Sequence, residues 1–183
     1  PIGIIFTGGP NSVYDPASPH IDEAVLSLGI PVLGICYGCQ LIAYTLGGRV
    51  EHAAQSEYGK REFSFVRENL LSVGIPRTSV CWMSHTDHVT EVPQGFEILA
   101  STESCPVTVY GSAEKRVYGV QFHPEVVHSE YGNEILKNFL YNVCGAKGDW
   151  TMSNFVAEQV ASLKAKIGDK KVLCAMSGGV DSA

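Results

Sequence analysis

The chain has 183 residues, 45% of them hydrophobic and 17% charged, and a formal net charge of −6 at pH 7. This length allows one domain and the start of another, and the composition is that of an ordinary globular protein. The acidic balance argues against a nucleic-acid partner, which would require a basic face. No run approaches the roughly 18 apolar residues that span a membrane, and no secretory signal pattern opens the chain.

The six cysteines are scattered along the chain, and two of them, Cys81 and Cys174, lie in apolar, strand-like runs. A reduced, buried thiol is the common state of cysteine in such positions. A chain of this length can also form a core without disulfide bonds. We therefore expect a reducing, cytoplasmic compartment.

Strand and helix patterns alternate over the first part of the chain. Residues 2–6 form an apolar run typical of a strand that is covered on both faces. A helix capped by Ser18 is predicted to run as far as Gly29. Residues 30–35 form a second buried strand, and a helix is predicted over residues 38–46.

The pattern then changes to short strands separated by turns. The predicted strands cover residues 62–67, 79–83, 97–101, 107–110 and 117–122. A helix over residues 133–143 follows, and the polar segment 146–153 has the composition of a domain boundary. Beyond it the spacing predicts a helix that ends near Ile167 and a strand over residues 171–176. We expect one domain over residues 1–146 and the start of a second over residues 147–183, with both domains truncated.

The segment around Cys36 carries the strongest chemical signal. A buried strand ends at Ile35, Cys36 follows at once, and a helix begins beside Gly38. This order matches a nucleophile elbow, in which a sharp turn lifts a reactive atom above a parallel sheet. Glycine suits such a turn because close backbone neighbours leave little room for a Cβ atom. The N-terminus of the following helix favours a thiolate.

Two other interpretations of Cys36 stay open from the residues alone. It could be a core cysteine at the end of a strand. Cys36 and Cys39 could also form a redox C-x-x-C pair, since the spacing is right and a helix follows. Against the redox pair, nothing else in the chain suggests a small thioredoxin-like domain.

A candidate base for the thiol follows the strand predicted at residues 117–122. His123 is followed by Pro124, which favours an extended backbone at His123, and then by Glu125. Residues two apart in extended backbone point the same way. Glu125 can therefore orient the ring of His123, as the third member of a catalytic triad does. The alternative is a solvated histidine at a strand end.

The other histidines are weaker candidates. His20, His52 and His128 lie in polar or helix-start surroundings and are predicted to be on the surface. His85 and His88 have a spacing that could hold a metal ion. Because no second cluster completes such a site, we expect no metal and instead interpret their segment as a loop that faces the substrate.

Taken together, these motifs closely resemble the class I (triad) glutamine amidotransferases. The resemblance extends to about residue 145 and rests on four segments, which are Thr7-Gly8-Gly9-Pro10, Gly34 to Gln40, Trp82-Met83-Ser84-His85 and Gly119 to Glu125. It implies an α/β fold with a mixed, mostly parallel open sheet and flanking helices, similar to flavodoxin. It also implies that the first strand of the family precedes residue 1.

The resemblance further implies roles for six residues. These are Cys36 as nucleophile, His123 as general base and then acid, Glu125 as the group that orients His123, Gly9 and Tyr37 as backbone donors of the oxyanion hole, and Gln40 beside the bound glutamine.

The last residues suggest a second activity. A strand followed by a turn rich in serine and glycine can bind an anion with its N–H groups, although a simple tight turn is the alternative. The turn also resembles the phosphate loop of the N-type ATP pyrophosphatases, which implies ATP and Mg²⁺ as cofactors. The residues concerned are Ser177, Gly178, Gly179, Val180, Asp181 and Ser182.

The order of the two resemblances implies an enzyme that releases ammonia from glutamine and passes it to an ATP-dependent synthetase that aminates XMP. The implied partners are glutamine, ATP and XMP, and we expect neither a nucleic-acid partner nor a membrane. A homodimer is also implied, formed through a C-terminal domain beyond residue 183. One alternative is the glutaminase domain of another amidotransferase. An alternative from a different class is a non-enzymatic thiol sensor that uses Cys36 and Cys39.

Overall fold

The computed structural model describes residues 1–149 and 151–173. The chain divides into two compact units, residues 1–146 and 147–183, and each is described by itself. The strands of the first unit are β1 (Ile4–Phe6), β2 (Val32–Ile35), β3 (Arg49–Phe65), β4 (Thr78–Glu91), β5 (Glu97–Ser101), β6 (Val109–Ser112) and β7 (Val117–Val120). Its helical elements are the 3₁₀ turn η1 (Glu23–Ser27), α1 (Tyr37–Thr45), α2 (Gly132–Asn138) and the π-helical turn η2 (Phe139–Val143).

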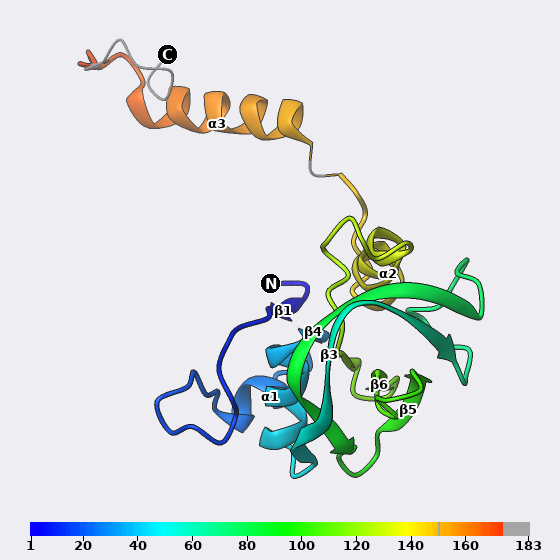
Figure 1. Cartoon of the computed structure of the whole chain (residues 1–183). Helices are drawn as coiled ribbons and strands as arrows, with labels where there is room; N and C mark the ends of the chain where they lie inside the picture. Colours follow the sequence, from blue (N-terminus) through cyan, green and yellow to red (C-terminus); the bar gives the residue numbers. More distant parts are fainter. Residues whose placement is uncertain (150, 174–183) are drawn as a thin grey trace. The chain divides into compact units, whose positions relative to one another are not determined.

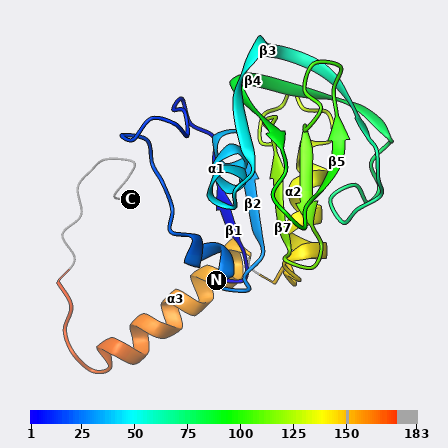
Figure 2. The same ribbon diagram turned by 90° about the horizontal axis from the view of Figure 1, so that it is seen from below.

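The strands form one seven-stranded sheet in the order β1-β2-β7-β6-β5-β3-β4 (Figures 1 and 2). The pairs β1–β2 and β2–β7 are parallel, whereas the four pairings from β7 through β6, β5 and β3 to β4 are antiparallel. With helices packed on it, this sheet is the mixed α/β fold that the sequence predicts, but the expectation that its pairings are mostly parallel is wrong, because the long hairpin of β3 and β4 and the strands β5 and β6 add antiparallel pairs.

Helices cover both faces of the parallel part of the sheet (Figure 2). Val32 packs with α1 in one buried cluster, while the next residue, Leu33, belongs to a second cluster with Ile135 of α2 and Phe139 of η2. Alternate residues of a strand point to opposite faces, which explains why neighbours join different clusters. All four residues of β2 are buried, as their unbroken apolar run indicates.

Strands β3 and β4 are much longer than the sequence analysis predicts, with 17 and 14 residues instead of the short strands at 62–67 and 79–83. They pair over most of their length, with an irregularity in register between His52 and Glu57. Two features hide this hairpin in the sequence. Its outer face is polar, and Glu57 and His85 occupy buried positions where the strand pattern calls for apolar residues.

The helix predicted between Ser18 and Gly29 is wrong in extent. Only the turn η1 forms, and Asp22 caps it by accepting a hydrogen bond from the N–H of Ala24 at 2.9 Å. The Ser18 hydroxyl instead donates to the carbonyl of Ser12 at 2.7 Å. None of the residues of η1 is buried, so packing does not support a longer helix.

The remaining predictions can be compared over the described residues. β5 has the predicted bounds, and α2 with η2 occupies the span of the predicted helix at 133–143. In the second unit, α3 (Met152–Ile167) is capped by Thr151, which accepts from the N–H of Asn154 at 3.1 Å.

The strand predicted at 171–176 has no counterpart at residues 171–173, and residues 174–176 lie outside the described residues. No described helix has the length and apolar character that crossing a membrane requires.

The close packing of α1 against β1 makes a testable demand on Gly38. A Cβ atom at this position would lie 2.3 Å from the carbonyl oxygen of Phe6 in β1. We expect Gly38→Ala to lower the free energy of unfolding by about 3 kcal/mol or more, because backbone must move to relieve this overlap. Urea denaturation measures the change.

Gly74→Ala is the matched control, because Gly74 has a positive φ of 73° but no atom near its added Cβ. It should cost roughly 1–2 kcal/mol from backbone conformation alone. Equal losses for the two variants would contradict the close contact between α1 and β1.

Candidate active site

Cys36 lies in a strained turn between β2 and α1. Its backbone has φ 50° and ψ −107°, a conformation that residues with a side chain rarely adopt. A Cβ atom added to Gly34 would lie 2.5 Å from the carbonyl oxygen of Gly38, so the two arms of the turn touch. The N–H of Cys36 donates to the carbonyl of Val120 at 2.9 Å, which ties the turn to β7. This is the geometry of the predicted nucleophile elbow.

The candidate base is fixed through its backbone. The N–H of His123 donates to the carbonyl of Trp82 in β4 at 3.0 Å, and its carbonyl accepts from the Ser129 hydroxyl at 2.6 Å. The same hydroxyl oxygen accepts from the N–H of Trp82 at 3.0 Å. Ser129 therefore joins the segment after β7 to β4, a role that the sequence analysis missed because an isolated serine carries no pattern.

Cys36, His123 and Glu125 come together in the order of a triad. Nδ1 of His123 lies 2.7 Å from Oε1 of Glu125. The pKa of His123 is raised to about 9, and a hydrogen bond with Cys36 is the largest cause. Burial lowers the pKa, and the hydrogen bond with Glu125 raises it further. A Cβ atom at Gly8 would lie 2.9 Å from Cε1 of His123 and 3.4 Å from Cβ of Cys36, so Gly8 packs against both side chains.

A cavity of about 470 Å³ opens beside these groups. Its walls are residues 9–11, Cys36 and Gln40, residues 84–87 of β4, and His123, with Tyr58 at one side. The volume falls within the range typical of small-molecule sites. The Cys36 residue is only 5% exposed, which keeps the thiol within the cavity wall.

Of the other predicted site residues of the first unit, Gly9 and Gln40 also line this cavity. A Cβ atom at Gly9 would lie 3.8 Å from Cβ of Tyr37, so these two residues are neighbours. The side chain of Gln40 is buried and donates from Nε2 to the carbonyl of Asp87 at 2.6 Å. The predicted phosphate loop at 177–182 lies outside the described residues.

The wall at residues 84–87 is part of strand β4 and not the loop that the sequence analysis predicts. The carbonyl of Ser84 faces Sγ of Cys36 at 3.7 Å. The carboxylate of Asp87 accepts from the Ser12 hydroxyl at 2.7 Å and lies 3.1 Å from Nδ1 of His52. The motif around Trp82 indicates that this segment matters, but the contacts depend on strand pairing that the motif does not encode.

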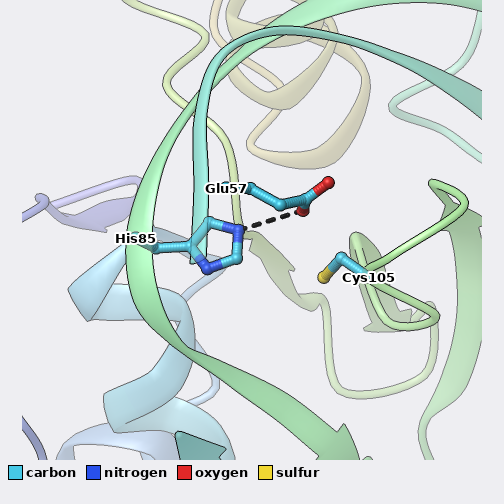
Figure 3. Close-up of side chains that lie close together, drawn as sticks. All are labelled: Glu57, His85 and Cys105. Carbon is cyan, nitrogen blue, oxygen red and sulfur yellow. Dashed lines mark hydrogen bonds and ion pairs between the residues drawn. The ribbon is translucent and has the colours of Figure 1, made fainter. Parts of the chain in front are cut away.

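His85 has partners that the sequence did not reveal. Glu57 of β3 and Cys105 of the β5–β6 connection lie beside it, and one ligand atom from each of the three lies within 4.8 Å of the others (Figure 3). The expectation that no second group joins His85 is therefore wrong. His20, His52 and His128 are exposed, as predicted.

A redox pair of Cys36 with Cys39 is not favoured by the surroundings of Cys39. Its side chain is fully buried, and burial raises the pKa of its thiol well above the ordinary value. Attack on a disulfide requires a thiolate, which such a thiol rarely forms. Free thiols are present at Cys36, Cys39, Cys81, Cys105 and Cys144.

The raised pKa of His123 predicts a pH dependence of stability. Protonated His123 stabilises the fold, and this contribution is complete below the ordinary pKa of 6.5 and is lost as the pH rises through about 9. We expect the free energy of unfolding of the native chain to fall over this range, and His123→Gln to reduce the slope. Urea denaturation at a series of pH values measures both slopes; identical slopes would contradict the Cys36–His123 interaction.

Comparison with known proteins agrees with this geometry. Residues 1–143 match the family described as glutamine amidotransferase class-I. Over all 183 residues the chain is 57% identical to a GMP synthase (glutamine-hydrolyzing) of Caldicellulosiruptor saccharolyticus and 56% identical to one of Acetivibrio thermocellus. It spans 36% of the length of each of these relatives.

A solved structure of a Thermoplasma acidophilum protein, proposed to be one subunit of a GMP synthase, superposes with a TM-score of 0.65 at 31% identity and covers 86% of this chain and 76% of its own. A glutamine amidotransferase of Methylobacillus flagellatus shares the fold, with a TM-score of 0.58 at 24% identity over 68% of this chain and 52% of its own. The chain belongs to the class I glutamine amidotransferase family.

Proposed function

We propose that this chain hydrolyses glutamine to glutamate and ammonia with Cys36 as the nucleophile. The observation that carries the proposal is that Cys36 and His123 line one cavity, with Glu125 in contact with His123, in a chain of the class I family. A thiol, an imidazole and an orienting carboxylate are the groups that covalent acyl transfer requires. The cavity is also large enough for an amino acid.

The reaction proceeds through a thioester. Neutral His123 takes the proton of the Cys36 thiol, the sulfur attacks the side-chain amide carbon of glutamine, and the carbonyl π electrons move onto oxygen. Protonated His123 gives its proton to the amide nitrogen, the carbon–nitrogen bond breaks, and ammonia leaves. Neutral His123 then takes a proton from water, the hydroxide attacks the thioester carbon, and glutamate departs as Cys36 recovers its proton through His123.

Each of the other site residues has one task in this sequence. Glu125 keeps the ring of His123 in place through the 2.7 Å contact with Nδ1. The N–H groups of Gly9 and Tyr37 stabilise the oxyanion of the tetrahedral intermediate, a contribution of about 3 kcal/mol for one such donor. Gln40 lines the part of the cavity where the rest of glutamine binds.

We further propose that the chain is the ammonia-producing part of a larger glutamine-hydrolysing GMP synthase. The support is the 57% and 56% sequence identity, over the whole chain, to two proteins of that name. This chain spans 36% of the length of each of them. On this proposal residues 147–183 begin an ATP pyrophosphatase domain, and Ser177 to Ser182 bind ATP. ATP with Mg²⁺ drives the amination of XMP to GMP. Dimerisation through a later domain and a cytoplasmic location belong to the same proposal.

Cys36→Ala in the full-length enzyme tests the nucleophile. We expect glutamine-dependent synthesis of GMP to vanish, because no thioester can form. Synthesis from added ammonium should continue, because the nucleotide site can then take ammonia from solution and does not depend on glutamine hydrolysis. GMP formation from XMP is measured with each nitrogen source. Survival of glutamine use in the variant would overturn the assignment of Cys36.

The same assay addresses the alternative that this glutaminase serves a different synthetase. AMP release that depends on XMP supports GMP synthesis. Hydrolysis of glutamine without any such release would retain the role of Cys36 and overturn the identity of the synthetase.

A further inference from the structure

A buried ionisable pair lies at one wall of the cavity and has no part in the proposed reaction. Glu57 of β3 and His85 of β4 have side chains that are 2% and 1% exposed, and Nε2 of His85 lies 3.2 Å from Oε2 of Glu57 (Figure 3). His85 belongs to the segment 84–87 that lines the cavity. Groups of this kind are costly to bury and call for an explanation.

The carboxylate of Glu57 joins several segments of the chain. Its Oε1 accepts from the Ser104 hydroxyl at 2.6 Å and from the Thr102 hydroxyl at 3.2 Å. Nε of Arg61 lies 3.7 Å from the same oxygen. Strand β3, strand β4 and the β5–β6 connection therefore meet at one charged group, which holds their relative positions.

A metal site is the first alternative, because carboxylate, imidazole and the nearby Cys105 thiol are ligands that zinc accepts. One observation speaks against it, because both oxygens of Glu57 already accept from protein donors. The carboxylate of Glu57 is therefore already satisfied by protein groups.

The hydrogen bond to Glu57 fixes the state of His85. Burial is the largest influence on its pKa and lowers it, so the ring is neutral at neutral pH. A neutral ring that faces a carboxylate through Nε2 carries its proton on that nitrogen, and Nε2–H donates a hydrogen bond to Glu57. Both the tautomer and the orientation of the ring are thereby set.

The orientation of His85 in turn fixes its neighbours along β4. The carbonyl of Ser84 faces Sγ of Cys36 at 3.7 Å, and the carbonyl of Asp87 accepts from Nε2 of Gln40 at 2.6 Å. These two carbonyls connect the wall to the nucleophile and to the residue proposed to lie beside glutamine. A shift of His85 would move both.

We propose that Glu57 is a positioning residue that acts through His85 to hold residues 84–87 in place as the glutamine-binding wall of the cavity. The inference rests on the proposed glutaminase function. Glu57 does not touch the substrate, and its effect reaches the reaction through the position of the wall.

Glu57→Ala and Glu57→Gln in the full-length enzyme test the proposal. We expect Glu57→Ala to lower kcat/KM for glutamine about 10²-fold, the effect of a misplacement of about 1 Å. Most of the loss should appear as a higher KM for glutamine. Glu57→Gln keeps an oxygen that can accept from His85 and should recover kcat/KM to within about tenfold of the native enzyme.

Two controls separate positioning from general destabilisation. Ammonium-dependent synthesis should be unchanged in both Glu57 variants. Asn138→Ala removes hydrogen bonds to the carbonyls of Leu71 and Val73, away from the cavity, and should lower stability without raising the KM for glutamine. An unchanged KM in Glu57→Ala, or equal losses with ammonium and glutamine, would overturn the proposal.

Further measurements cover the remaining outcomes. Nitrogen NMR of the native enzyme at neutral pH should show His85 with its proton on Nε2; an Nδ1–H tautomer or an imidazolium would overturn the proposal even if Glu57→Ala does not fold. Loss of glutamine hydrolysis on chelation, restored by zinc and mimicked by Cys105→Ser, would replace positioning with a metal centre. The native enzyme and Cys36→Ala are assayed in the same series as the Glu57 variants. Glutamine use that survives in Cys36→Ala would overturn the glutaminase assignment itself, separately from the role of Glu57.

Discussion

The contact of backbone with backbone around Cys36 is the constraint on which the site depends. A Cβ atom at Gly34 would overlap the carbonyl of Gly38, and one at Gly38 would overlap that of Phe6. Strand β1, the end of β2 and the start of α1 are therefore in direct contact, and the turn holds Cys36 at φ 50°. Such a conformation costs about 1–3 kcal/mol and persists only where surrounding packing enforces it. The two buried clusters on either side of β2 provide that packing.

The sheet then brings His123 to Cys36. β2 and β7 are parallel neighbours with Ile35 paired to Val120, so the residues that follow both strands leave the sheet at the same edge. Ligand sites of open α/β sheets lie at this carboxyl edge. The segment after β7 is further tied to β4 through His123 and Ser129, and β4 contributes the facing wall of the cavity. Three strands thus determine the relative positions of Cys36 and His123, the pair proposed to carry the reaction.

The sequence predicts best where local pattern and tertiary packing agree. The apolar run at 32–35, the turn at Cys36 and the bounds of β5 are of this kind. It fails where a buried polar pair interrupts the pattern, as Glu57 and His85 do in the long hairpin of β3 and β4. It also fails at Ser18, which has the chemistry of a helix cap but hydrogen-bonds elsewhere because no helix there is packed. The pairing of Cys36 with His123 is predicted from the motifs around both residues and from the resemblance, whereas the contacts of residues 84–87 depend on the strand pairing itself.

The most direct test of the account uses a glutamine analogue with an electrophilic ketone in place of the side-chain amide. The proposed geometry brings this carbon to the sulfur of Cys36 while His123 is within hydrogen-bonding reach of the thiol. Peptide mapping by mass spectrometry should find a single covalent adduct on Cys36, formed more slowly in His123→Gln and suppressed by excess glutamine. An adduct on another cysteine, or labelling of Cys36 that neither glutamine nor the loss of His123 affects, would contradict the account.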